Sequence, residues 1–206
     1  MLIGIDFDNT IVCYDALFHR VALERTLIPQ GLAPSKLEVR DHLRKTGRED
    51  LWTEMQGYVY GARMGEATTY PGVLEFFSWA RAAGIELAIV SHKTRVPFAG
   101  PAYDLHQAAH AWIVKTFIDR PVPLLSEDKI FFELTKGEKV ARIAAIAADC
   151  FIDDLSEIFV IPEFPRSTAK LLFDPEGKCS STDDISAFRS WKELREHIAA
   201  TCKMPI

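Results

Sequence analysis

Apolar residues occur along the chain in short, nearly continuous runs rather than in strict alternation with polar residues. A strand that is buried on both faces needs apolar side chains at successive positions, as in a parallel sheet. Five runs have this character and predict five strands: Leu2–Ile5, Glu86–Val90, Lys129–Phe132, Cys150–Ile152 and Ala169–Phe173. The pattern therefore indicates a parallel sheet.

Segments with apolar residues at helical spacing separate these runs. One extends over residues 73–83, and Gly84 is expected just after its C-terminus. Another has an apolar stripe that begins at Val140. The last opens with a Ser190–Glu193 capping-box pattern and places Trp191, Leu194 and Ile198 on one face. This alternation predicts a three-layer α/β fold, with a Rossmann-like parallel sheet and helices on both of its faces.

One stretch, residues 14–70, contains helical patterns but no good strand. Its helices are expected over 17–28, after a Ser35–Glu38 capping box, and around 51–59. Because most strand-to-helix connections are far shorter, we expect residues 14–70 to form a small helical cap inserted after the first strand. Residues 1–13 and 71–206 then form the α/β core. The alternative is an ordinary set of crossover helices.

The composition is that of a globular domain, with 48% hydrophobic and 26% charged residues among 206. The net charge of −5 and the lack of a Lys/Arg block argue against nucleic-acid binding. No signal peptide and no membrane-spanning apolar run is evident, so we expect no membrane association and a cytoplasmic location. The four cysteines are far apart, which argues against a zinc site or a disulfide framework. Nothing in the sequence indicates the oligomeric state.

Polar side chains follow several of the predicted strands, where parallel strands bring their carboxyl ends to one edge of the sheet. They are Asp6, Asp8 and Thr10 after the first strand, Ser91 after the second, Asp153 and Asp154 after the fourth, and Lys136 at a helix start. Four carboxylates repel one another unless a cation binds among them. Oxygen ligands favour Mg²⁺, and the lysine and hydroxyls would then face the oxygens of a substrate phosphate.

These motifs, in this order, resemble those of the haloacid dehalogenase-like (HAD) superfamily. The matching features are DFDNT, a Ser that ends a second apolar strand, a Lys that opens a helix, and a DD pair after a later strand. The segment YPGVLEFFSWARAAGIELAIVS is also typical of the phosphatases of this superfamily. The resemblance covers most of the chain, and the helical insert stands where a C1 cap is found.

The resemblance implies specific roles for the carboxylates. Asp6 would be the nucleophile that forms an aspartyl-phosphate, and Asp8 the general acid and base. Mg²⁺ would be held by Asp6, the backbone carbonyl of Asp8 and Asp153, with Asp154 binding directly or through water. Because dehalogenases of the superfamily lack the second Asp, Asp8 points to phosphoryl transfer.

The resemblance also implies a phosphate-binding group. Ser91 would donate to the phosphoryl oxygens, and Lys136 would offset negative charge, with Lys139 as the alternative lysine. Thr10 is the third candidate for this phosphate-binding group, although a role in supporting the turn suits it better. His92 and Lys93 follow Ser91 directly and could line the substrate pocket; the alternative is an ordinary polar loop.

Three functions remain open at this point. The first is a Mg²⁺-dependent phosphatase of a small phosphorylated metabolite, since a cap would exclude bulky protein substrates. The second is a phosphotransferase or phosphomutase, which passes the same aspartyl-phosphate to an organic hydroxyl. The third is a non-catalytic binding module that retains the fold. The motifs do not separate the first two, and they do not identify the substrate.

Overall fold

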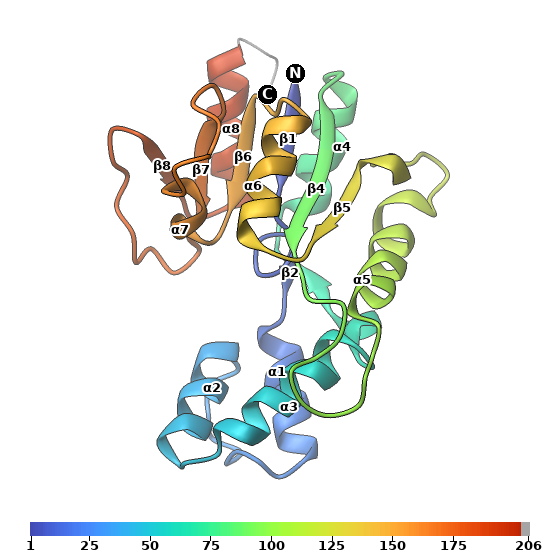
Figure 1. Cartoon of the computed structure of the whole chain (residues 1–206), viewed down its shortest axis with the longest axis vertical. Coiled ribbons are helices and arrows are strands. Elements are labelled where there is room, and N and C mark those ends of the chain that lie inside the picture. The colour runs from blue at the N-terminus through green and yellow to red at the C-terminus, as the bar shows by residue number, and fades with distance from the viewer. Residues whose placement is uncertain (203–206) are drawn as a thin grey trace. The chain divides into compact units, whose positions relative to one another are not determined.

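The computed structural model describes residues 1–202, with side chains described for residues 1–201, and it contains a six-stranded sheet in which every pairing is parallel (Figure 1). The strand order is β5-β4-β1-β6-β7-β8. The bounds are β1 Leu2–Ile5, β4 Glu86–His92, β5 Ile130–Glu133, β6 Cys150–Asp153, β7 Ala169–Phe173 and β8 Ile185–Phe188. The predicted parallel sheet is therefore confirmed, and all five predicted strands are present.

Strand β8 was not predicted. It is a short edge strand, and all four of its residues are only partly buried. Ser186 interrupts its apolar residues, so it has neither the continuous apolar run of a central strand nor enough length to show a clear alternation.

Helices cover both faces of this sheet, with α6 and α7 on one side and α4 and α8 on the other (Figure 1). Their bounds are α4 Val73–Ala82, α6 Lys136–Ala145, α7 Ser156–Phe159 and α8 Trp191–Cys202. The three-layer arrangement is the one that the alternating pattern predicted. Gly84 lies just beyond α4 with a φ of +68°, as expected for a residue that ends a helix.

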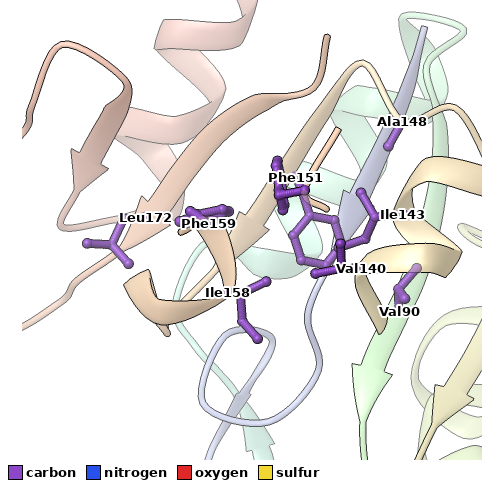
Figure 2. Close-up of a cluster of buried hydrophobic side chains, with 9 residues drawn as sticks. Val90, Val140, Ile143, Ala148, Phe151, Ile158, Phe159 and Leu172 are labelled. Carbon is purple, nitrogen blue, oxygen red and sulfur yellow. The ribbon is translucent and has the colours of Figure 1, made fainter. Parts of the chain in front are cut away.

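The core on the α6 side of the sheet is a cluster of buried apolar side chains that includes Phe151 of β6, Val140 and Ile143 of α6, and Ile158 of α7 (Figure 2). Phe151 lies so close to β1 that a Cβ on Gly4 would be 2.5 Å from its ring. A glycine in the central strand therefore lets the large ring pack directly over the sheet. This packing fixes β6 against β1 near the edge where Asp6 follows β1 and Asp153 ends β6.

The chain divides into two compact units. The first, the core unit, comprises Met1–Val12, Thr69–Lys93 and Phe117–Ile206, and the second, the helical unit, comprises Cys13–Thr68 and Thr94–Thr116. The chain passes between the two units through two short strands that pair with each other, β2 Val12–Cys13 and β3 Thr68–Thr69. The helical unit thus includes residues 94–116, which the sequence analysis assigned to the core.

The helical unit contains α1 Asp15–Glu24, α2 Lys36–Lys45, α3 Glu49–Tyr60, the 3₁₀ turn η1 Met64–Glu66, and α5 Leu105–Ile113. Ser35 caps α2 as predicted, because its side chain accepts from the amides of Leu37 and Glu38. Helix α1 ends at Glu24, four residues before the predicted end at Ile28, and Thr26 just after it has a φ of +55°. The remaining elements are the π-helical turn η2 Val114–Ile118 and the 3₁₀ turn η3 Glu127–Lys129.

Among the described residues, no helix has the length and apolar character needed to cross a bilayer.

Candidate active site

Two aspartates lie side by side at the carboxyl edge of the sheet because their strands are neighbours. Ile5 of β1 pairs with Ile152 of β6, so the next residues along, Asp6 and Asp153, lie side by side at the edge of the sheet. The amide of Asp6 donates to the carbonyl of Ile152 at 2.8 Å, which extends the pairing by one step. Carboxylate oxygens of Asp6, Asp153 and Asp154 all lie within 4.8 Å of one another.

A buried lysine joins two of these carboxylates, and it is Lys139 rather than Lys136. The Lys139 ammonium donates to Asp6 Oδ1 at 2.6 Å and to Asp153 Oδ2 at 2.7 Å, and the residue is 1% exposed. Lys136 instead forms an ion pair at 2.7 Å with Glu157, and its side chain is 42% exposed. The preference for Lys136 at the phosphate site is therefore corrected.

The reason is the position of each lysine along α6. Lys136 is the first residue of the helix, which is capped at Thr135 by the capping box with Glu138. From there its side chain meets Glu157 on α7. Lys139 lies one turn further on, next to Val140, and its ammonium is 5.4 Å from the centre of the Phe151 ring. This extra turn brings its amine to the sheet edge.

The protonation of this cluster is governed by its burial. Desolvation raises the pKa of Asp6 from 3.8 to about 7; the Lys139 ammonium opposes this rise, and Asp153 and Asp8 add to it. Burial by itself would lower the pKa of Lys139, but Asp153 and Asp6 raise it above its usual value, so the amine stays charged. The carboxylates are in excess over the ammonium, and a further cation among them would relieve that excess.

Thr10 and Asp154 connect the loop after β1 to the loop after β6. The fully buried Thr10 hydroxyl lies 3.2 Å from Asp154 Oδ1 and 3.4 Å from Asp6 Oδ2, and it accepts from the amide of Asp154 at 3.1 Å. The loop itself turns at Asn9, which has a φ of +63°. These contacts match a turn-supporting Thr10 and leave its hydroxyl engaged with carboxylates rather than directed to a phosphate.

Asp8 has a partner that sequence reasoning did not identify. The Lys93 ammonium donates to both Asp8 oxygens, at 3.0 and 2.7 Å, and Lys93 is 4% exposed. The Lys93 amide donates to the Glu133 carbonyl at 2.8 Å, so the backbone beyond β4 is fixed against β5. The only signal in the sequence was the position of Lys93, two residues after Ser91, which had marked it as a pocket residue.

His92 and Ser91 differ in how their polar atoms are used. His92 Nε2 lies 3.0 Å from the carbonyl of Leu134, and burial lowers the pKa of the imidazole. Ser91 is fully buried, and no described residue makes a hydrogen bond to its hydroxyl. Because buried hydroxyls are nearly always paired, this one is available for an oxygen of a ligand.

The residues fit the magnesium and phosphate that the sequence implies. The donor set is made of carboxylate oxygens, the ligands that Mg²⁺ prefers, and it contains no described sulfur or imidazole ligand. The carboxylates Asp6, Asp8, Asp153 and Asp154 outnumber the two buried ammonium groups at this edge, Lys93 and Lys139. The buried, unpartnered Ser91 hydroxyl is a further donor that an anion could use.

Comparison with known proteins gives a uniform answer about the fold. A haloacid dehalogenase-like hydrolase from Streptococcus pneumoniae matches with a TM-score of 0.60 and 14% identity over 96% of this chain and 97% of that one. A HAD family hydrolase from Deinococcus radiodurans, solved with bound phosphate and sodium, matches with a TM-score of 0.57 and 16% identity over 98% and 96%.

A third structure, a HAD-hydrolase from Bacillus subtilis bound to magnesium, matches with a TM-score of 0.54 and 14% identity over 96% of this chain and 97% of that one. No protein-family model and no curated protein matches the sequence. The likeness thus lies in the backbone, over almost the whole of each chain. The chain has the fold of the haloacid dehalogenase-like superfamily.

Proposed function

We propose that this protein is a HAD-type hydrolase, specifically a Mg²⁺-dependent phosphatase of a small phosphorylated metabolite that acts through an aspartyl-phosphate. One observation carries the proposal: the Asp6–Lys139–Asp153 group is buried at the sheet edge that also holds the unpartnered Ser91 hydroxyl. Similar folds with bound phosphate and with bound magnesium support it.

Asp6 is the proposed nucleophile. A carboxylate oxygen of Asp6 attacks phosphorus, the bond from phosphorus to the ester oxygen breaks, and the phosphoryl group is held as an acyl phosphate. Lys139 keeps its positive charge beside Asp6 throughout and offsets charge on the transferring group. Ser91 donates its hydroxyl to a phosphoryl oxygen. Mg²⁺, when held by Asp6, Asp153, Asp154 and the Asp8 backbone carbonyl, supplies further neutralisation of the phosphoryl charge.

Asp8 is the proposed general acid and base. It gives a proton to the leaving oxygen, then takes one from the water that attacks the acyl phosphate, which releases inorganic phosphate and restores Asp6. Lys93 holds both Asp8 oxygens in the structure, so Asp8 must leave this ion pair before it can donate a proton. A substrate phosphate offers Lys93 another anion, in keeping with the substrate-binding role proposed for it.

The small size of the proposed substrate rests on the interpretation of residues 14–70 as a C1-type cap. These residues account for most of the helical unit, whose α1, α2 and α3 pack together around Phe18 and Trp52, with ring centres 5.0 Å apart. A cap of this kind would admit metabolites and exclude folded proteins. His92 remains a proposed pocket residue.

A phosphotransferase or phosphomutase would use the same groups with an organic hydroxyl in place of water. No feature among the described residues favours it over hydrolysis, so it stays the second candidate. The two are separated by their products: inorganic phosphate in one case, a new phosphate ester in the other.

The test is a screen of purified protein with Mg²⁺ against a panel of small phosphate esters, with inorganic phosphate as the readout. We expect release from at least one ester, loss of release in Asp6→Asn, and reversible loss when a chelator removes the metal. If the panel yields neither phosphate nor a transferred phosphoryl group, the chain is a binding module that has retained the fold.

A further inference from the structure

Trp191, the first residue of α8, contacts the loop that carries Asp6 and Asp8 without belonging to the site. Its indole N–H donates to the backbone carbonyl of Thr10 at 3.2 Å, and the residue is 1% exposed. The sequence analysis placed Trp191 only on the apolar face of the last helix. A buried indole N–H needs an acceptor, and here the acceptor is in the loop between β1 and β2.

Thr10 carries this contact on to two candidate metal ligands. Its carbonyl is held by Trp191, while its hydroxyl lies 3.2 Å from Asp154 Oδ1 and 3.4 Å from Asp6 Oδ2. The same hydroxyl accepts from the amide of Asp154 at 3.1 Å. A single buried residue therefore links the start of α8 to the carboxylates that follow β1 and β6.

The indole itself is held firmly. It packs edge-on against Phe76 of α4 at 4.9 Å and lies 5.8 Å from the ring of Phe173 at the end of β7. A Cβ on Gly72, which has a φ of +88°, would be 3.0 Å from the Trp191 Cβ, so the start of α4 approaches closely. With α4 and β7 on its sides, the ring has little freedom, and the position of its N–H is well defined.

We propose that Trp191 is a positioning residue for cation binding: its indole N–H fixes Thr10, whose hydroxyl aligns Asp6 and Asp154 for a divalent cation. The inference rests on the proposed function for the identity of the cation site. Groups that orient metal ligands typically change metal affinity or activity by about 10–100-fold when removed. Trp191 acts through one further residue, so we expect the lower end of this range.

The experiment measures Mg²⁺ binding to the whole protein by calorimetry, without any substrate. W191F keeps a packed ring and removes the N–H donor. The matched control is W112F, because Trp112 is 5% exposed and its indole N–H also donates to a backbone carbonyl, that of Ala67, at 2.9 Å in the helical unit. We expect W191F to bind Mg²⁺ about 10-fold more weakly than the unaltered protein and W112F to bind it equally well.

A double-mutant cycle distinguishes alignment through Thr10 from a general loosening of the fold. T10V removes the hydroxyl at nearly constant volume and should weaken Mg²⁺ binding at least as much as W191F. If Trp191 acts through Thr10, the double variant binds hardly more weakly than T10V alone. Should W191F not fold, fluorine NMR of the fluorotryptophan-labelled protein gives a second readout, in which Mg²⁺ shifts the Trp191 resonance and leaves that of Trp112 in place.

Several results would overturn the role of Trp191: unchanged affinity in W191F, equal weakening in W191F and W112F, additive effects with T10V, an unmoved Trp191 resonance, or no Mg²⁺ binding by the unaltered protein. Failure of the proposed phosphatase gives a different result. If the variants differ in Mg²⁺ affinity as expected and no phosphate is released from any ester, the positioning role stands and the proposed reaction does not.

Discussion

Two groups of charged side chains, one in each unit, have nearly the same contact distances and very different surroundings. In the core unit, Lys139 lies 2.6 Å from Asp6 and 2.7 Å from Asp153, and these three side chains are 2%, 7% and 0% exposed. Their charges are thus almost completely withdrawn from water.

In the helical unit, Arg63 lies 2.7 Å from Glu24 and also pairs with Glu66, which in turn lies 2.6 Å from Arg20. The side chains of Arg20, Glu24 and Glu66 are 52%, 46% and 43% exposed, and only that of Arg63, at 17%, is largely covered. Positive and negative groups alternate in this surface network, and water solvates most of them.

The comparison shows that burial and the balance of charge, rather than distance, distinguish the candidate site from the surface network. Charges that stay in contact with water remain hydrated, and ion pairs between them contribute little to the stability of the fold. Buried charges with one sign in excess are costly, which is why desolvation raises the pKa of Asp6 to about 7. Such an arrangement is explained most simply by a ligand that supplies the missing charge.

The largest effect is expected at the proposed nucleophile. Asp6→Asn removes the attacking oxygen while keeping the shape of the side chain, so phosphate release should fall by at least about 10³-fold. The metal-free variant should unfold at the same temperature or higher, because it removes one buried negative charge from a group with an excess. Steady-state phosphate release measures the loss of activity, and thermal unfolding measures the effect on stability. Residual turnover within tenfold of the unaltered protein would rule out Asp6 as nucleophile.

The second prediction compares two lysines of the same helix. Lys139→Met leaves Asp6 and Asp153 buried without their ammonium, so the free energy of unfolding in metal-free buffer should fall by about 3–5 kcal/mol. Lys136→Met removes only the ion pair with Glu157 and should change it by less than about 1 kcal/mol. Urea unfolding of both variants is the measurement. Equal losses would mean that burial does not separate the two ion pairs.

The third prediction concerns pH. The pKa of Asp6 is about 7 in the folded chain and near 3.8 in the unfolded chain, so the folded state binds more protons between these values. Raising the pH through this window should therefore lower the stability of the metal-free protein, by at least about 1 kcal/mol between about pH 5 and about pH 8.

The control for this pH dependence is Asp6→Asn, which cannot titrate. Its unfolding free energy should change less over the same window, and the difference between the two proteins isolates the contribution of Asp6. Addition of Mg²⁺ to the unaltered protein should flatten the curve as well, since a bound cation favours the ionised carboxylate. If the unfolding free energy rose with pH in the unaltered protein and not in Asp6→Asn, the predicted direction would be wrong.

Some parts of the structure leave a pattern in the sequence and could be predicted, whereas others depend on contacts that leave no such pattern. The parallel sheet and the meeting of Asp6 with Asp153 were predictable, because continuous apolar runs indicate buried parallel strands and such strands end at a common edge. The choice between Lys136 and Lys139 was not predictable, since both lie on one helix face and differ only in their position along α6. The pairing of Lys93 with Asp8 depends on loop conformation, for which the sequence contains no periodic signal.

The same reasoning explains why the sequence analysis assigned residues 94–116 to the core, although they cluster with the helical unit. Their place in the helical unit depends on close contacts with α3: a Cβ on Gly57 would be 2.6 Å from Pro97, and a Cβ on Gly61 would be 2.4 Å from Tyr103. In the sequence, each glycine is merely a residue of low helix propensity within or just after a predicted helix. Their use as contact points for a distant loop becomes visible only in three dimensions.

The smallest effect is expected in the surface network, and it tests the comparison from its other side. Glu66→Gln removes the charge that pairs with both Arg63 and Arg20 while keeping the length of the side chain. Because Glu66 is exposed and Arg63 keeps Glu24 as a partner, the midpoint of thermal unfolding should fall by no more than about 2 °C. Added salt should reduce even this change, and phosphate release should not alter. If Glu66→Gln destabilised the protein as much as Lys139→Met, exposure would not be the property that separates the two groups, and the inference from buried charge to ligand binding would lose its basis.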